Sequence, residues 1–136
     1  MDTRDQNVRT WSMLCHLAAL AGFFFPIGTV IGPLIVWQIK KNELPEIDPH
    51  GKEAVNFQLT ILIVNIIAGI IIFGILGWGW GFGQFWRSPF YLFGGGGLGI
   101  ILVIINLLSW VLAIVAGIKA NNGESYKYPF SFRFIK

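Results

Sequence analysis

The sequence predicts an all-α integral membrane protein, a helical bundle of four segments. Only 12% of the 136 residues are charged and 54% are hydrophobic, with a mean hydropathy of +0.65. A soluble domain has about 25% charged residues. Between Thr10 and Ile118, the charged residues are confined to positions 40–53 and to Arg87. They leave three uncharged stretches, at 10–39, 54–86 and 88–118. Each stretch is long enough to cross a bilayer, which takes about 20 apolar residues in a helix.

The first stretch is predicted to form a broken helical hairpin over residues 8–40. A single helix of this length would run about 45 Å, well beyond the hydrocarbon thickness. Pro26 interrupts the stretch, and proline kinks or ends a helix. We therefore expect helices at 8–25 and 27–40. The second is too short to cross upright, so the sequence leaves open whether the hairpin crosses fully.

Two full transmembrane helices are expected at 49–77 and 98–119. A polar loop at 41–53 precedes them, in which Asp48 is predicted to cap the helix and Pro49 to be its first residue. This helix is expected to enter the membrane near Phe57. The predicted loop at 78–97 is rich in glycine and in tryptophan, which favours the membrane interface. Asn122-Gly123 is a typical helix stop, and the tail occupies 120–136.

The distribution of Lys and Arg predicts the orientation. The loop at 41–53 and the C-terminal tail share a side, because two spans separate them. With a complete first hairpin, nine of the ten basic residues lie on that side, and only Arg87 lies opposite. By the positive-inside rule both termini are then cytoplasmic. We expect the bacterial inner (plasma) membrane as the location.

The last residues alternate between phenylalanine and polar side chains. Phe130, Phe132 and Phe134 alternate with Ser131 and Arg133, which is the period of a strand. Such a strand could pair with a partner or lie on the membrane surface. The simpler interpretation, an aromatic tail packed at the interface, is favoured.

Four polar positions inside the membrane are candidate site residues: Asn65, Asn106, Ser109 and His16. Asn65 and Asn106 lie at similar depth on antiparallel helices, so a mutual hydrogen bond is expected, worth roughly 0.6–2 kcal/mol. Ser109 could join them. The pair either holds the helices together or lines a polar path. His16 is expected to be neutral and hydrogen-bonded, with a proton or ligand role as the alternative.

No reaction centre is predicted. The single cysteine, Cys15, excludes an internal disulfide. Cys15 and His16 are adjacent, and adjacent helical side chains point apart. The carboxylates around His50 have irregular spacing, so no metal site is expected there, and Gly51-Lys52 lacks the rest of a phosphate loop. We therefore expect no enzyme activity, no cofactor and no nucleic acid.

Pairs of small residues four positions apart permit close helix packing, within the chain or between copies. These pairs are Ala18/Gly22, Gly28/Gly32, Gly95/Gly99 and Ala113/Gly117.

Four motifs occur in an order that resembles one family pattern. They are WSMLCHL at 11–17, IGPLIVW at 31–37 followed by Lys40-Lys41, HGKEAVNFQ at 50–58 and KANNGESYKYP at 119–129. The pattern is similar to small bacterial membrane proteins of unknown function, grouped with the Tic-twenty-like component of the chloroplast import translocon. The resemblance implies a role in conducting proteins through a membrane complex and offers no catalytic residues.

The resemblance also marks characteristic positions, and most of them fall at the predicted cytoplasmic face. We expect the first hairpin, residues 48–58 and the tail to pack into one structure there. The characteristic positions are His16, Pro33, Trp37, Gly51, Lys52, Asn56, Gln58, Asn121, Gly123, Tyr128 and Pro129. The candidate cytoplasmic-face cluster is Trp37, His50, Gly51, Lys52, Asn56, Gln58, Asn121 and Tyr128.

The predicted function is that of a non-enzymatic subunit or adaptor of a membrane assembly, in protein translocation or transport. Its partners would be the lipid bilayer and other membrane proteins or a second copy. The alternative is a self-contained channel or carrier for a small solute, with Asn65 and Asn106 on its path.

Overall fold

The computed structural model describes residues 2–77 and 97–136, and over these residues the chain is all-α, as predicted. The predicted loop at 78–97 lies, apart from Gly97, outside the described residues. Four α-helices and two short 3₁₀ helices make up the described structure. They are α1 (Thr3–Leu17), η1 (Ala18–Phe23), α2 (Gly28–Lys40), η2 (Pro45–Ile47), α3 (Asp48–Gly77) and α6 (Gly97–Asn121).

The first stretch is a hairpin that breaks where the sequence predicted. After α1 the chain tightens into η1, turns over residues 24–27, which include Pro26, and returns as α2. The predicted start at residue 8 is wrong, because α1 begins at Thr3. Polar residues form these extra turns at the surface, where Arg4 makes a salt bridge of 2.8 Å to Glu46. The apolar residues of the sequence indicated only the part of α1 that packs against other helices, and its exposed first turns carry no such signal.

The two limbs of the hairpin touch through glycines. A Cβ at Gly32 would lie 2.1 Å from the Ala18 backbone oxygen, and one at Gly28 would lie 2.6 Å from that of Ala21. A Cβ at Gly22 would meet the Thr29 side chain. The small-residue spacings here therefore serve packing inside the chain.

The start of α3 differs from the predicted cap. Asp48 has helical backbone angles (φ −55°, ψ −44°), because η2 leads directly into α3. Its carboxylate accepts a hydrogen bond of 3.0 Å from Trp37 Nε1. The helix therefore starts one residue before the predicted position 49, and Asp48 links α3 to α2.

The end of α6 follows the expected stop signal. The Gly123 amide donates to Ala120 O and the Glu124 amide to Lys119 O, which is the Schellman pattern. Gly123 has φ +83°, a conformation that glycine adopts without a Cβ penalty. The helix spans 97–121, slightly longer than the predicted 98–119.

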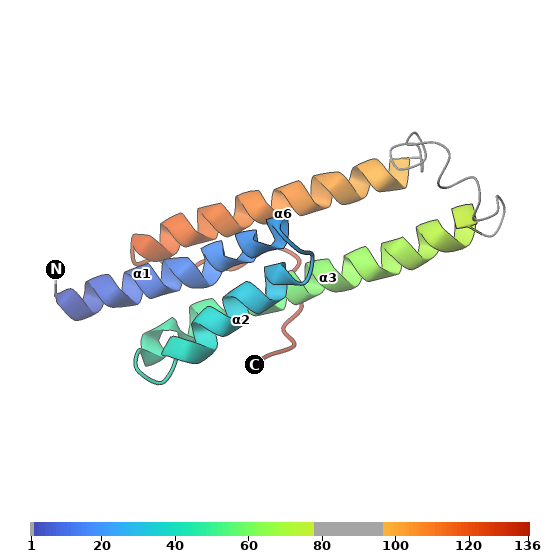
Figure 1. Cartoon of the computed structure of the whole chain (residues 1–136). Coiled ribbons are helices and arrows are strands. Elements are labelled where there is room, and N and C mark those ends of the chain that lie inside the picture. Colours follow the sequence, from blue (N-terminus) through green and yellow to red (C-terminus); the bar gives the residue numbers. More distant parts are fainter. Residues whose placement is uncertain (1, 78–96) are drawn as a thin grey trace.

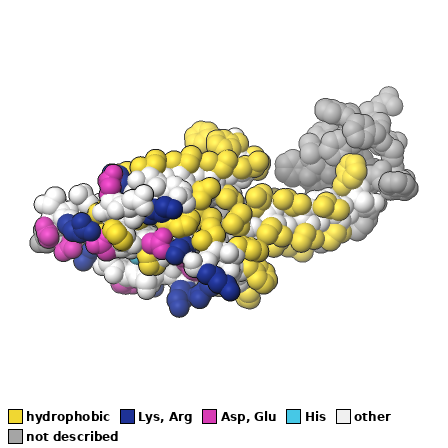
Figure 2. Space-filling view, turned by 90° about the horizontal axis from the view of Figure 1, so that it is seen from below, with side chains coloured by type: hydrophobic (Ala, Val, Ile, Leu, Met, Phe, Trp, Pro, Cys, Tyr) yellow, Lys and Arg dark blue, Asp and Glu magenta, His cyan; other side chains and the backbone are white. Residues whose placement is uncertain are grey.

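The long helices α3 and α6 run on beyond the ends of α1 and α2 (Figure 1). Both are long and apolar enough to cross a membrane. Their outward side chains are exposed, as Ile66, Ile70, Ile104 and Leu107 illustrate. Figure 2 shows charged side chains gathered at one end of the described structure and hydrophobic ones along the long helices. This separation is typical of a membrane protein with one end in water.

Adding one methyl group at Gly32 should destabilise the hairpin, because the group would overlap backbone rather than a flexible side chain. We expect Gly32→Ala to lower stability by about 1–3 kcal/mol, measured as a lower unfolding temperature in detergent. Gly69→Ala is the matched control, since a Cβ there meets nothing within 4 Å. Equal unfolding temperatures for the two variants would contradict the close-packed hairpin.

Candidate functional site

His16 lies at the centre of a buried cluster that joins α1, α3 and the C-terminal tail. Its side chain is fully buried. Its Nδ1 lies 2.9 Å from Tyr128 Oη, and its Nε2 lies 3.2 Å from His50 Nδ1. The two imidazole rings meet nearly edge to face, at 84°. The hydrogen bonds expected for His16 are therefore present, with partners 112 and 34 positions away in the chain.

Cys15 and His16 point into different surroundings although they are adjacent. Cys15 is a free thiol in an apolar cluster with Val30, Trp37 and Val55. His16 instead contacts His50 and Tyr128. Neighbouring positions on a helix differ by about 100° in direction, so α1 supplies an apolar contact to α2 and a polar contact to α3 and the tail.

Tyr128 is anchored on several sides. Its ring stacks on Phe57 with centroids 4.1 Å apart and planes 7° apart. Its backbone amide donates a hydrogen bond of 2.7 Å to Glu53 Oε1. Burial raises the pKa of the Tyr128 phenol, so the group stays protonated. A neutral hydroxyl can either donate to His16 Nδ1 or accept from it.

The Trp37 ring covers the first turns of α3. A Cβ at Gly51 would lie 2.2 Å from Trp37 Cγ, so only glycine fits beneath the ring. Lys52 forms a salt bridge of 2.6 Å to Asp48, which also holds Trp37 Nε1. The hydrogen bond from Lys52 holds the pKa of the Asp48 carboxyl below its usual range. Burial lowers the pKa of His50, which favours a neutral imidazole in these polar turns outside the apolar span.

The side-chain amide of Asn56 holds the end of the tail against α3. Asn56 Nδ2 donates to Ile135 O and the Ile135 amide donates to Asn56 Oδ1, both at 2.8 Å. The Phe132 amide donates to Thr60 Oγ1 at 3.0 Å. The tail is thus held by side chains of α3. Its described residues form no strand, which was the less favoured of the two interpretations of the alternation. Phe130, Phe132 and Phe134 remain exposed.

Asn65 and Asn106 form the predicted pair. Their amides exchange two hydrogen bonds, of 3.1 and 2.9 Å, between α3 and α6. Asn106 Nδ2 also donates to Leu102 O at 2.8 Å. Ser109 does not join the pair, because its hydroxyl donates to the Asn106 backbone oxygen. Serine in a helix readily bonds to a preceding carbonyl, which the spacing of side chains does not reveal.

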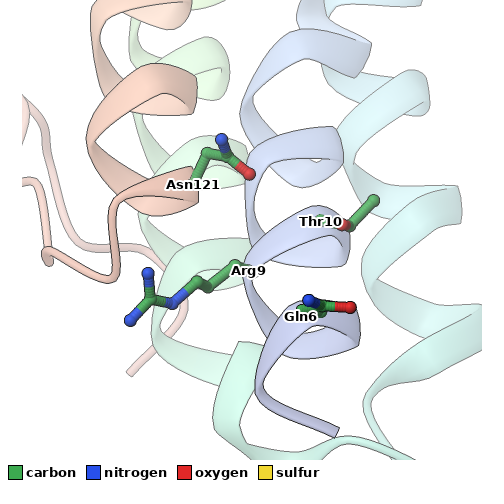
Figure 3. A pocket seen from close by; sticks show the side chains of 4 residues that line it. All are labelled: Gln6, Arg9, Thr10 and Asn121. Carbon is green, nitrogen blue, oxygen red and sulfur yellow. The ribbon is translucent and has the colours of Figure 1, made fainter. Parts of the chain in front are cut away.

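Two further predicted residues, Gln58 and Asn121, form no hydrogen bond with the residues of this cluster. Gln58 is fully buried, and within the described residues its amide has no hydrogen-bond partner. Asn121 lies at the end of α6 and lines a surface notch of about 280 Å³ with three residues of α1 (Figure 3). Those residues are Gln6, Arg9 and Thr10.

At His16 the structure joins the predicted intramembrane positions to the predicted cytoplasmic-face cluster. His16 was placed with the membrane residues, yet it contacts His50 and Tyr128 of the predicted face cluster. Sequence reasoning missed this contact and the roles of Glu53 and Phe57 at Tyr128. The sequence placed His16 close to the membrane interface, where His50 also lies, and this shared depth could have indicated their contact.

Residues 7–135 match the family model described as the magnetosome magnetite crystal formation protein family. No curated protein and no solved structure matches the chain. The family match overturns the resemblance to the Tic-twenty-like group, and with it the expectation of protein translocation. The short motifs behind that resemblance lie in the packed hairpin, at the start of α3, and at the end of α6 with the tail.

Removing the Asn56 amide should release the tail, because two backbone groups of Ile135 would lose their partner. We expect Asn56→Ala to make the chain cleavable by trypsin after Arg133 under conditions in which the wild type resists. An unmade buried hydrogen bond costs about 1–3 kcal/mol, so cleavage should be at least about fivefold faster. Asn122→Ala, at an exposed position, is the control. Unchanged cleavage in Asn56→Ala would argue against the clamp.

Proposed function

Because the chain belongs to the magnetosome magnetite crystal formation protein family, we propose that it acts in the magnetosome membrane as a non-enzymatic subunit of a membrane assembly that supports crystal formation. This location replaces the plasma membrane expected from the sequence. The observation that carries the proposal is the division of the molecule into a packed polar end and a largely uncovered apolar pair of helices.

The apolar pair supports a role embedded in lipid and open to partners. Along α3 and α6 the outward residues are large and exposed, and only the facing sides are covered within the chain. In a bilayer these surfaces contact lipid or other helices. Among the exposed side chains are Ile63, Ile67, Phe73, Ile100, Val103, Leu108 and Val111.

The packed end supports an adaptor better than a catalyst. Cys15 and His16, the candidates for a nucleophile or base, are fully buried. Of the charged residues near them, Lys52 pairs with Asp48, and Glu53 accepts a hydrogen bond from the Tyr128 amide. The positive-inside rule favours the cytoplasmic side for this end, so its charged surface would face cytoplasmic partners.

The alternative, a carrier with a path through Asn65 and Asn106, has less support. A path for a polar solute needs amide groups that can bind the solute in place of water. Here each amide bonds to the other, and Asn106 bonds to Leu102 as well. Reciprocal bonding is what hides two polar groups from hydrocarbon, as helix-to-helix contacts require.

The test replaces both amides in a magnetite-forming host. Deleting the gene should change crystal size or shape, and wild-type protein should restore it. Asn65→Leu with Asn106→Leu leaves no amide unpaired, so an adaptor should keep its function at equal membrane levels. Loss of crystal formation by this double variant, at normal abundance and together with solute flux by the pure wild type in liposomes, would favour the carrier.

The assembly is tested by mass spectrometry of the intact protein purified from magnetosome membranes in mild detergent. We expect stoichiometric protein partners or a defined homo-oligomer. A monomer that carries only lipid, purified in parallel with an intact control complex, would contradict the subunit role.

A further inference from the structure

We propose that His16 and His50 together bind a divalent first-row transition-metal ion, held between His16 Nε2 and His50 Nδ1. The inference stands on the contact of the two rings and on the partner of His16, and it does not depend on the proposed function. Imidazole suits zinc, copper, iron and nickel among these ions.

The separation of the two nitrogens already fits a shared ion. A metal about 2.0–2.1 Å from each of two imidazole nitrogens, with an angle of about 90–110° between them, places those nitrogens about 2.8–3.4 Å apart. His16 Nε2 and His50 Nδ1 are 3.2 Å apart. The ion would therefore need a rotation of a ring and no movement of α1 against α3.

The ring of His16 is oriented as metal-bound histidines are. Such a histidine donates its other ring N–H to an oxygen, which fixes the tautomer. His16 Nδ1 lies 2.9 Å from Tyr128 Oη, which can accept that proton. The lone pair is then on Nε2, facing His50. Stacking on Phe57 and the hydrogen bond to Glu53 hold Tyr128 in place.

Proton balance does not oppose binding. Each neutral imidazole carries one N–H, which His16 keeps on Nδ1 and His50 moves to Nε2. Both nitrogens that face the ion are then free, and no net proton is released. His50 is only partly buried, so the ion reaches the pair from its side.

Two protein ligands make this an exchangeable site. Within residues 2–77 and 97–136, no group of three or more His, Cys, Asp or Glu side chains is arranged to hold a metal. Water that reaches the ion from the partly exposed side of His50 would complete the coordination. Structural zinc sites have four protein ligands and catalytic ones three, so a two-ligand site suits an ion that is taken up and passed on.

The test uses Co²⁺ with the full chain in detergent, purified without a histidine tag. We expect one Co²⁺ per chain, with visible absorption and X-ray absorption showing imidazole nitrogen. His50→Gln and His16→Gln should each weaken binding at least tenfold, while Glu124→Gln, at an exposed position, should not change it. Tyr128→Phe keeps the ring but removes the hydroxyl, and should weaken binding about 10–100-fold.

His50→Gln is the decisive variant, because the glutamine amide can still donate a hydrogen bond to His16 Nε2 while it removes the imidazole ligand. Its unfolding temperature is measured to confirm that it folds. Absence of Co²⁺ binding by the wild type up to millimolar concentration would overturn the proposal. Equal binding by the wild type and a folded His50→Gln variant would overturn it as well. Either result leaves the membrane-assembly role untouched, because that role is read from crystal formation and from partners.

Discussion

The packed end of this protein depends on the buried hydrogen bonds that run from Tyr128 through His16 to His50. His16 has no contact with water, so both ring nitrogens need partners inside the chain. One partner comes from the tail and the other from the start of α3. This requirement fixes the rotation of α1 about its axis and brings the last residues of the chain back over α3.

Buried polar groups also need hydrogen-bond partners in the apolar part of α3 and α6, but they find them in another way. Hydrocarbon offers no hydrogen bonds, so backbone groups must be satisfied within helices and polar side chains must pair. Asn65 and Asn106 meet this demand with each other. Over residues 61–74 of α3 and 99–118 of α6, the exposed side chains are apolar, and lipid is as good a neighbour for them as protein. The spans therefore need little internal packing, whereas the polar end needs dense contacts.

The chain belongs to a family that acts in magnetite crystal formation, and the family match covers both the packed end and the apolar helices. The apolar helices place the chain in a membrane, and the packed end presents charged groups beside it (Figure 2). The histidine pair is the one place in the described residues where two ring nitrogens already stand at the spacing that a metal ion takes. An ion bound there would contact His16, whose other ring nitrogen bonds to Tyr128 of the tail.

The sequence by itself determined the helices, the break at Pro26, the stop at Gly123 and the pairing of Asn65 with Asn106. Each follows from local chemistry or from a rise of 1.5 Å per residue. Only the tertiary structure decided that His16 meets His50 and Tyr128, and that Asn56 holds the end of the tail along α3. The physical reason is that such contacts join residues up to 112 positions apart. They depend on how each helix is rotated and on the path of the tail, which no local pattern encodes.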